Sequence, residues 1–542
     1  MKFKRKAFTL IEILLIVSLL AILSVIVIVA LNPVKWFAEM RNSERRNDAK
    51  SVLDALWQYK VDNNGVLPLG VDNSLRMLGT DTTNCNIVCG GGSGGSSSNG
   101  TISDSNQANF QLGSFFHMQW NTGSNVLEMT NVGKTAGAGS YTSRIFDAGA
   151  PVSWSNFSWS PAKPVKKQLP NNAQSESGYA SGNANMTSNV LLMHMDEASG
   201  NITDYSGKGH NGTAAGGITY KSNGIYNSSL LFNGSSGRIT VPYSSDFFPT
   251  NQITIEAWLK WNIVPSTGLQ WASIVNTNAD NGYRLQHNST NTLFEIAVPT
   301  TSSPGSGRWI WSTTAPQMGV WYYVVGVYDG SYLRMYVNGV QESYTTLTGT
   351  IIPNSSPLYI SQWGESGRYF NGNIDEVAIY SRALSATEIA DRYARGSTDL
   401  NFQVRSCSDS ACTGKSFIGP DGTSSTYYSE INNSGSTPPT FNFSSLSGRY
   451  FQYKADFTTI NSNLSSQVKS VSGAYTVPAT NTTQTSCLDI SSSLVPKYMA
   501  FMPFSPKGTA SKTYFAVKKN DAGRIEVVSC DPELNEVIDV SR

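Results

Sequence analysis

An apolar run near the start of the chain constrains its fold most. From Phe8 to Leu31 about two dozen residues carry one charge, Glu12, and a leader with four basic residues precedes them. A helix of that length spans about 36 Å, enough to cross a bilayer with its basic end in the cytoplasm. The run is too long for a cleaved secretory signal and lacks its small-residue cleavage site. We therefore predict a membrane-spanning segment at residues 8–31.

Glu12 needs a partner in that setting. A carboxylate at membrane depth costs roughly 2.5 to 3.5 kcal/mol, so a charge kept there normally serves a function. The residues around it, KAFTLIE, resemble the type III signal of type IV pilins and pseudopilins. The resemblance implies that prepilin peptidase cuts between Ala7 and Phe8 and methylates the new amino terminus. It also implies that Glu12 pairs with the terminal amine of a neighbouring subunit in a filament.

One departure and one alternative accompany this resemblance. The residue before the cut is Ala7, where the family usually has Gly, so cleavage efficiency is in question. The alternative is an uncleaved membrane anchor.

The stretch after the apolar run predicts a second helical part. Asn32 and Pro33 interrupt the run, because proline lacks a helical donor and clashes with the preceding turn. Asn63, Asn64 and Gly65 are expected to end the helix. Between them, a buried stripe is predicted from apolar residues at three- and four-residue spacing, namely Ala49, Val52, Leu53 and Leu56, with Tyr59 or Lys60. The segment RRNDAKSVLDALWQYKVDNNGVLP also resembles pilin sequence, which implies a leader at 1–7 and a helix over 8–68.

Composition places the rest of the chain among extracellular β-proteins. Only 14% of the 542 residues are charged and the net charge is +1, so there is no basic surface for nucleic acid. The chain has 47 Gly, 25 Tyr and 12 Trp, and its middle is rich in Ser, Thr and Asn. Its length suggests roughly three or four domains.

Cysteine usage agrees with an exported protein. Six cysteines form three local groups, which are Cys85 with Cys89, Cys407 with Cys412, and Cys487 upstream of Cys530. An even count favours disulfides, and no spacing matches a zinc ribbon or a redox pair. Proximity alone predicts three bridges, and free thiols are the alternative.

The chain returns to pilin character after Cys487. Residues 515–527 predict a hairpin that turns at Asn520 to Gly523. This part resembles the end of small pilin heads, which implies a head segment at 487–533 with Cys487 bridged to Cys530. Residues 69–107 contain a Gly/Ser-rich stretch without periodicity and are predicted to be a pilin loop and flexible linker. Everything between is then an insertion into a pilin head.

The insertion itself is predicted to be nested. Short alternating strands lie on both sides of a central segment, and neither half has enough strands for a core. We predict one split β-sandwich over 108–172 and 399–477, with one face formed by Leu400, Phe402 and Val404 and another by Phe451, Tyr453, Ala455 and Phe457. The alternative is two unrelated β-units.

The central segment, residues 188–397, carries the strongest β-signals. Asp329-Gly330 and Asn338-Gly339 separate alternating strands and predict a meander. A short helix follows, with Ser385 and Glu388 as a capping box, Leu384 and Ile389 as a hydrophobic staple, and Gly396 after its last turn.

This central segment resembles laminin-G-like, concanavalin-A-like jelly rolls. The resemblance is carried by DYSGKGHNGT, LLFNGSSGRITVP, TIEAWLKW, WYYVVGVYDGSYLRMYVNGV and IDEVAIYSRALSATEI. It implies two curved antiparallel sheets, often a structural calcium, and often carbohydrate or protein binding. Asp204 and Asp375 are the candidate calcium ligands. Alternatively, Asp204 shapes an Asx-turn and Asp375 ends a strand.

Four tryptophans are candidate ligand contacts. Trp309 and Trp311 alternate onto one face of a strand, and Trp271 and Trp363 lie near predicted loops. Exposed aromatic faces suit stacking on sugars, whereas core or rim packing is the structural alternative.

Catalysis is not expected. Related glucanases need two suitably placed carboxylates, and the adjacent Asp375 and Glu376 are predicted to point to opposite faces of a strand. The four histidines are isolated, and no nucleophile or phosphate-binding motif occurs.

These observations predict a mainly β protein with a long N-terminal helix, in which a pilin-like helix and small head carry an inserted β-sandwich and a jelly roll. The function expected is a minor or tip subunit of a type IV pilus, displaying a lectin-like domain for adhesion to glycans or surface proteins. Expected partners are other pilin subunits and prepilin peptidase, in the cytoplasmic membrane and then on an extracellular pilus. The alternatives are a structural major pilin, a pseudopilin for secretion or DNA uptake, and a surface glycanase.

Overall fold

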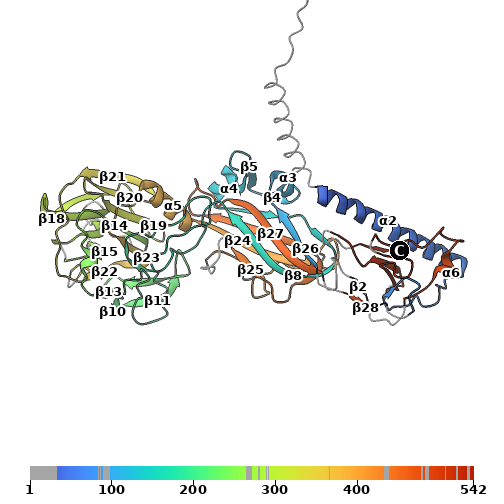
Figure 1. The fold of residues 1–542 in the computed structure, drawn as a ribbon. Helices are drawn as coiled ribbons and strands as arrows, with labels where there is room; N and C mark the ends of the chain where they lie inside the picture. The colour runs from blue at the N-terminus through green and yellow to red at the C-terminus, as the bar shows by residue number, and fades with distance from the viewer. Residues whose placement is uncertain are drawn as a thin grey trace, which may run out of the picture.

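The computed structural model describes residues 33–82, 85, 87–89, 98–263, 271–278, 281–288, 290, 292–364, 367–431, 439–477, 480–482, 487–506, 508–520, 523–533 and 538–542. Figure 1 shows three units in a row, with a helix and small sheet at one end, a ten-stranded sheet in the middle and a jelly roll at the other end. The protein is mainly β, as predicted.

The predicted membrane segment cannot be compared with this fold. Residues 8–31, and with them Phe8 and Glu12, lie outside the described residues, as does Ala7. Among the helices that are described, none is both long and apolar enough to cross a membrane.

The first unit is a helix on a four-stranded antiparallel sheet. Helix α2 (Pro33–Asp62) packs against a sheet of order β1-β29-β30-β31, with bounds Arg76–Met77, Phe515–Lys519, Ile525–Ser529 and Asp539–Ser541. The predicted stripe of Ala49, Val52, Leu53 and Leu56 is buried in this core. The helix ends where predicted, since Asn64 and Gly65 take left-handed φ values of 53° and 88°. The predicted hairpin over 515–527 is confirmed by the pairing of β29 with β30.

Two strand pairs lie where the chain leaves this unit and where it returns. Strand β2 (Ile87–Cys89) pairs with β28 (Thr480–Thr482), and β3 (Ser98–Asp104) pairs with β27 (Val468–Val477). The predicted flexible linker, which extended to residue 107, is therefore wrong for residues 98–104. A strand does not require regularly alternating apolar residues when its backbone groups are hydrogen-bonded to a neighbouring strand. Strand β3 is paired with β27 in this way over seven residue pairs.

The disulfides differ in part from those expected from proximity. Cys85 is bonded to Cys487, with their Cα atoms 5.1 Å apart, so the predicted bridges Cys85 to Cys89 and Cys487 to Cys530 are wrong. Cys530 is also disulfide-bonded. The reason is that the outgoing and returning chains lie side by side, which brings together cysteines 402 residues apart.

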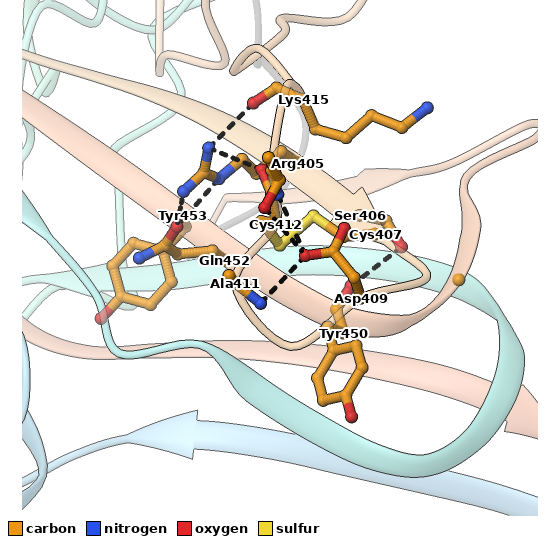
Figure 2. The surroundings of a disulfide bond; sticks show 12 residues. Arg405, Ser406, Cys407, Asp409, Ala411, Cys412, Lys415, Tyr450, Gln452 and Tyr453 are labelled. Carbon is orange, nitrogen blue, oxygen red and sulfur yellow. Dashed lines mark hydrogen bonds between the residues drawn. A yellow bond between two sulfur atoms is a disulfide. The ribbon is translucent and has the colours of Figure 1, made fainter.

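The predicted bridge between Cys407 and Cys412 is confirmed. Figure 2 shows the loop that it closes. Asp409 accepts hydrogen bonds from the backbone N–H groups of Ala411 and Thr413 at 3.1 Å. Arg405 fixes the residues after this loop by donating to Lys415 O at 2.8 Å, and it also donates to Gln452 Oε1 at 2.6 and 2.9 Å.

The middle unit is a sheet whose strands come from the segments that precede and follow the jelly roll in the sequence. Its main order is β4-β7-β26-β8-β27-β6-β5, with β24 on β26, β25 on β8 and β3 on β27. The remaining bounds are β4 Ser114–Phe116, β5 Met118–Asn121, β6 Val126–Met129, β7 Ala138–Thr142, β8 Phe146–Pro161, β24 Thr398–Cys407, β25 Thr440–Asn442 and β26 Ser447–Thr459, with helices α3 (Gln107–Phe110) and α4 (Asn131–Ala136). Strands β24 and β26 bring the two predicted apolar faces opposite each other, with Leu400 paired to Phe457 and Val404 to Tyr453.

The jelly roll stacks two antiparallel sheets on one apolar core. The seven-stranded sheet has the order β10-β13-β22-β15-β16-β17-β18, with bounds Thr213–Ala215, Arg238–Val241, Leu358–Ile360, Ala272–Asn276, Arg284–Asn288, Leu293–Thr300 and Ser303–Trp311. The eight-stranded sheet has the order β11-β12-β23-β14-β19-β20-β21, with β9 on β23, and bounds Ile218–Asn223, Ser228–Asn233, Asn371–Tyr380, Ile253–Trp261, Trp321–Tyr328, Tyr332–Val337, Val340–Thr346 and, for β9, Asn189–Met193. The predicted meander is confirmed, since β19, β20 and β21 are consecutive antiparallel neighbours.

Helix α5 (Ala386–Ser397) covers the outer face of the eight-stranded sheet. The predicted capping box of Ser385 and Glu388 is present. Gly396 does not follow the helix as predicted but lies within it. A Cβ at this position would lie 2.6 Å from the Trp258 ring, so the glycine allows the helix to approach the sheet closely.

Candidate functional site

The outer face of the seven-stranded sheet gathers polar and aromatic side chains. Leu285, Phe294, Ile296 and Ile310 of strands β16 to β18 point into the core between the sheets, so their neighbours in the chain point outward. We call this outward side the tryptophan face, and it consists of Ser273, Asn276, Arg284, Gln286, Asn288, Glu295, Trp309 and Trp311.

Glu295 is the centre of this face. Its Oε1 accepts a hydrogen bond from Gln286 Nε2 at 2.7 Å and lies 3.3 Å from Arg284 Nη2. Its Oε2 accepts from Asn288 Nδ2 at 2.7 Å and from Trp311 Nε1 at 3.0 Å. The carboxylate is only 1% exposed, so these charged and amide donors fix its position and that of the Trp311 ring.

The four predicted tryptophans fall into two pairs. Trp309 and Trp311 share the face on β18, as predicted from alternation, and are 45% and 41% exposed. Trp271 and Trp363 are linked by Arg368, whose guanidinium lies 5.2 Å and 4.0 Å from their ring centroids. Arg284 lies 5.7 Å from the Trp363 ring, which connects the second pair to Glu295 and hence to the first.

Two buried polar atoms on this face make no hydrogen bond to any of the residues that the structure describes. Ser273 and Gln286 stand opposite each other in register, and each is at most 1% exposed. Within the described part of the chain, neither Ser273 Oγ nor Gln286 Oε1 makes a hydrogen bond. Buried groups of this kind normally find a protein, water or ligand partner.

The candidate calcium ligands lie elsewhere, in separate protein hydrogen-bond networks. Asp204 accepts hydrogen bonds from the backbone N–H groups of Leu192, Ser206 and His210 at 2.9 to 3.0 Å. This arrangement fits the Asx-turn alternative. Asp375 Oδ2 accepts from the N–H groups of Ile225 and Tyr226 at 2.8 and 3.2 Å. Among the residues described, no three His, Cys, Asp or Glu side chains are grouped to hold a metal ion.

Asp375 and Glu376 do not alternate as predicted. Ile374 and Val377 both point into the core, and the register against β14 shifts here, so a β-bulge places both carboxylates on the other side of the sheet. Glu376 takes a left-handed φ of 48° and lies 2.6 Å from His194 Nδ1. Burial raises the pKa of both carboxyl groups. The prediction of opposite faces is therefore wrong.

The polar part of the tryptophan face was missed in the sequence. Arg284, Gln286 and Asn288 alternate with apolar Leu285 in the stretch RLQHN, and Glu295 interrupts the apolar run LFEIAV. Polar residues at period two on a strand indicate an outward face that is not covered by core, and this signal was available.

Comparison with known proteins supports the jelly roll. Residues 233–390 match the family model described as the concanavalin A-like lectin/glucanases superfamily, which confirms the predicted laminin-G-like domain over that range. No curated protein matches the chain.

Three solved structures illustrate the fold similarity. Domain 4 of an extracellular GH43 arabinanase from Geobacillus stearothermophilus is 20% identical, with a TM-score of 0.30, over 38% of this chain and 97% of that one. The binding domain of Paraclostridial mosquitocidal protein 1 is 14% identical, with a TM-score of 0.33, over 47% and 70%. Trypanosoma rangeli sialidase is 16% identical, with a TM-score of 0.30, over 38% of this chain and only 32% of its own length.

Proposed function

We propose that the chain is a type IV pilin-like subunit that displays its jelly roll as a glycan-binding domain. The observation that carries the binding part is the tryptophan face. Two half-exposed indole rings lie beside a buried network of amide and charged groups, and two buried polar atoms next to it make no hydrogen bond among the described residues. Stacking surfaces with a few fixed hydrogen-bonding groups are what a sugar ring requires.

The helix and sheet of the first unit support the proposed role as a filament subunit. The KAFTLIE motif precedes a helix whose second half packs on a four-stranded sheet. The first half of α2 instead exposes Trp36, Phe37 and Met40, each more than half accessible. In this proposal prepilin peptidase cuts between Ala7 and Phe8, and Glu12 pairs with the amine of the next subunit.

The position of the subunit follows from its size. Nearly 400 residues are inserted between Cys85 and Cys487, which would crowd a filament if every subunit carried them. We therefore place the chain at a minor or tip position of an extracellular pilus. Disulfide bonds agree with an extracellular setting.

A glycan array probed with the full chain in detergent tests the binding part. We expect binding to one class of glycan, and we expect Trp309→Ala and Trp311→Ala each to weaken it about tenfold. Tyr344→Ala is the control, because Tyr344 is an even more exposed aromatic residue on the other sheet. Binding that survives both tryptophan changes would reject this face as the site, and an array without any signal would favour a structural spacer. A parallel array with a chelator tests whether calcium contributes.

A further inference from the structure

The jelly roll joins the ten-stranded unit through two chain crossings that are fastened to each other. One is α5, which ends at Ser397 and continues directly into β24 at Thr398. The other is residues 162–188, which we call the connecting segment. It is bound to α5 by Lys163 Nζ, 2.7 Å from Asp391 Oδ1, and by Lys166 N, which donates to Arg395 O at 2.8 Å.

A buried ion cluster lies at this junction. Arg395 of α5 is 2% exposed and binds both carboxylate oxygens of Glu176 at 2.8 and 2.9 Å. Lys167 Nζ lies 3.2 Å from the same carboxylate. Two cations therefore share one anion within the connecting segment and α5.

A second carboxylate enters the junction from the ten-stranded unit. Glu430 is 2% exposed, and its Oε2 accepts a hydrogen bond from Tyr179 Oη at 2.6 Å and from Val165 N at 3.5 Å. Within the described residues, its Oε1 accepts no hydrogen bond. Burial raises the pKa of Glu430 to about 7, although Tyr179, Val165 N, Arg395 and Lys167 all act to lower it.

The connecting segment is held in a conformation that it would not adopt alone. Four of its non-glycine residues have left-handed φ values between 51° and 62°, namely Lys166, Asn172, Ala173 and Ser188. Such conformations cost of order 1 kcal/mol each and persist only where surrounding contacts impose them. The contacts at Glu430 and Arg395 are among those that hold the segment in this conformation.

We propose that Glu430 is a protonation switch that seats the jelly roll on the ten-stranded unit, with the connecting segment docked while Glu430 holds a proton and released when it loses it. The carboxyl group has a higher proton affinity in the docked state than in water. Docking is thus fully supported below pH 4.5, the ordinary pKa, and weakens as the pH rises through about 7. The device does not depend on what the jelly roll binds.

A second titratable pair, His194 and Glu376, contacts the same segment. Its contribution to the pH dependence must be distinguished from that of Glu430. His194 of the jelly roll binds Glu376 on one side and lies 2.8 Å from Asn171 Oδ1 of the connecting segment on the other. Its pKa is raised by Glu376 against the effect of burial, so it weakens docking in the same direction as the pH rises. A His194→Gln variant therefore accompanies the Glu430 variants.

Hydrogen exchange of the full chain in detergent tests the switch. The readout is the protection factor of peptides from residues 165–180 at pH 6.0 and 8.5, which removes the pH dependence of the intrinsic rate. For the unmodified chain we expect protection to fall about tenfold, as a pKa moved from 4.5 to about 7 requires. The fall should persist in His194→Gln and in the remote control Glu342→Gln. When Glu430→Gln, an isostere of the protonated form, is added to His194→Gln, the fall should disappear.

Two results would overturn the proposal. One is an unmodified chain with the same protection at both pH values, and the other is a Glu430→Gln/His194→Gln double variant that keeps the fall. Tyr179→Phe provides an independent check if Glu430→Gln does not fold. Removal of the hydroxyl donor destabilises the Glu430 anion, so the midpoint of the fall should move to higher pH, and an unchanged midpoint would also count against the switch.

Discussion

The two outer faces of the jelly roll have opposite designs. The outer face of the eight-stranded sheet is covered by α5, with Tyr393 of the helix packed on Trp258 and Tyr323 of the sheet. The face of the seven-stranded sheet carries Glu295 with its amide and guanidinium donors, and exposes Trp309 and Trp311. One sheet thus serves for attachment to the rest of the chain and the other remains available to a ligand. A single domain can do both because each sheet has only one side in the shared core.

The largest effect on stability is expected on the outer face of the eight-stranded sheet, where α5 packs. Arg392 of α5 donates to Glu256 Oε1 of β14 at 2.7 Å, and both side chains are at least 95% buried. Arg392→Ala leaves the Glu256 charge buried without its cation, so we expect a loss of about 3 to 5 kcal/mol in the free energy of unfolding. Urea denaturation measures it. The control is Arg334→Ala, which breaks the partly exposed pair with Asp329 and should cost about 1 kcal/mol or less. Equal losses in the two variants would mean that burial under α5 does not make the Arg392–Glu256 pair more important than an exposed pair on the same sheet.

A smaller effect is expected from Gly396→Ala. The added methyl group meets the Trp258 ring and the Tyr226 hydroxyl, so α5 must move away from the sheet. Overpacking of this kind costs about 1 to 3 kcal/mol. The double variant with Trp258→Phe should cost less than the sum of the single changes in a double-mutant cycle. Strict additivity would mean that the helix does not press on this ring.

The smallest effect on stability is expected on the tryptophan face of the seven-stranded sheet. Trp309 is 45% exposed and belongs to the tryptophan face, so Trp309→Ala should change the free energy of unfolding by only about 0.5 kcal/mol. The same urea titration measures it. A loss above about 2 kcal/mol would show that the ring is a packing element and would weaken its assignment as a ligand contact.

What could be predicted from the sequence was local. The hairpin of β29 and β30, the meander of β19 to β21 and the capping box of α5 each depend on residues within a few positions of one another. Trp309 and Trp311 could be placed on one face because a strand alternates with a period of two.

What could not be predicted depends on distant segments. Cys85 meets Cys487 only because β2 pairs with β28. Gly396 stays inside a helix because the Trp258 ring lies beneath it. The bulge at Asp375 and Glu376 arises from the register of β23 against β14, and the donors around Glu295 come from the two strands that neighbour its own.

The bond between Cys85 and Cys487 makes everything between them a covalent ring of about 400 residues. A protease that nicks this ring once, at any surface loop of the inserted units, cuts the polypeptide but leaves both fragments joined to the same base. Release of the jelly roll from this base then requires a second cleavage within the inserted units.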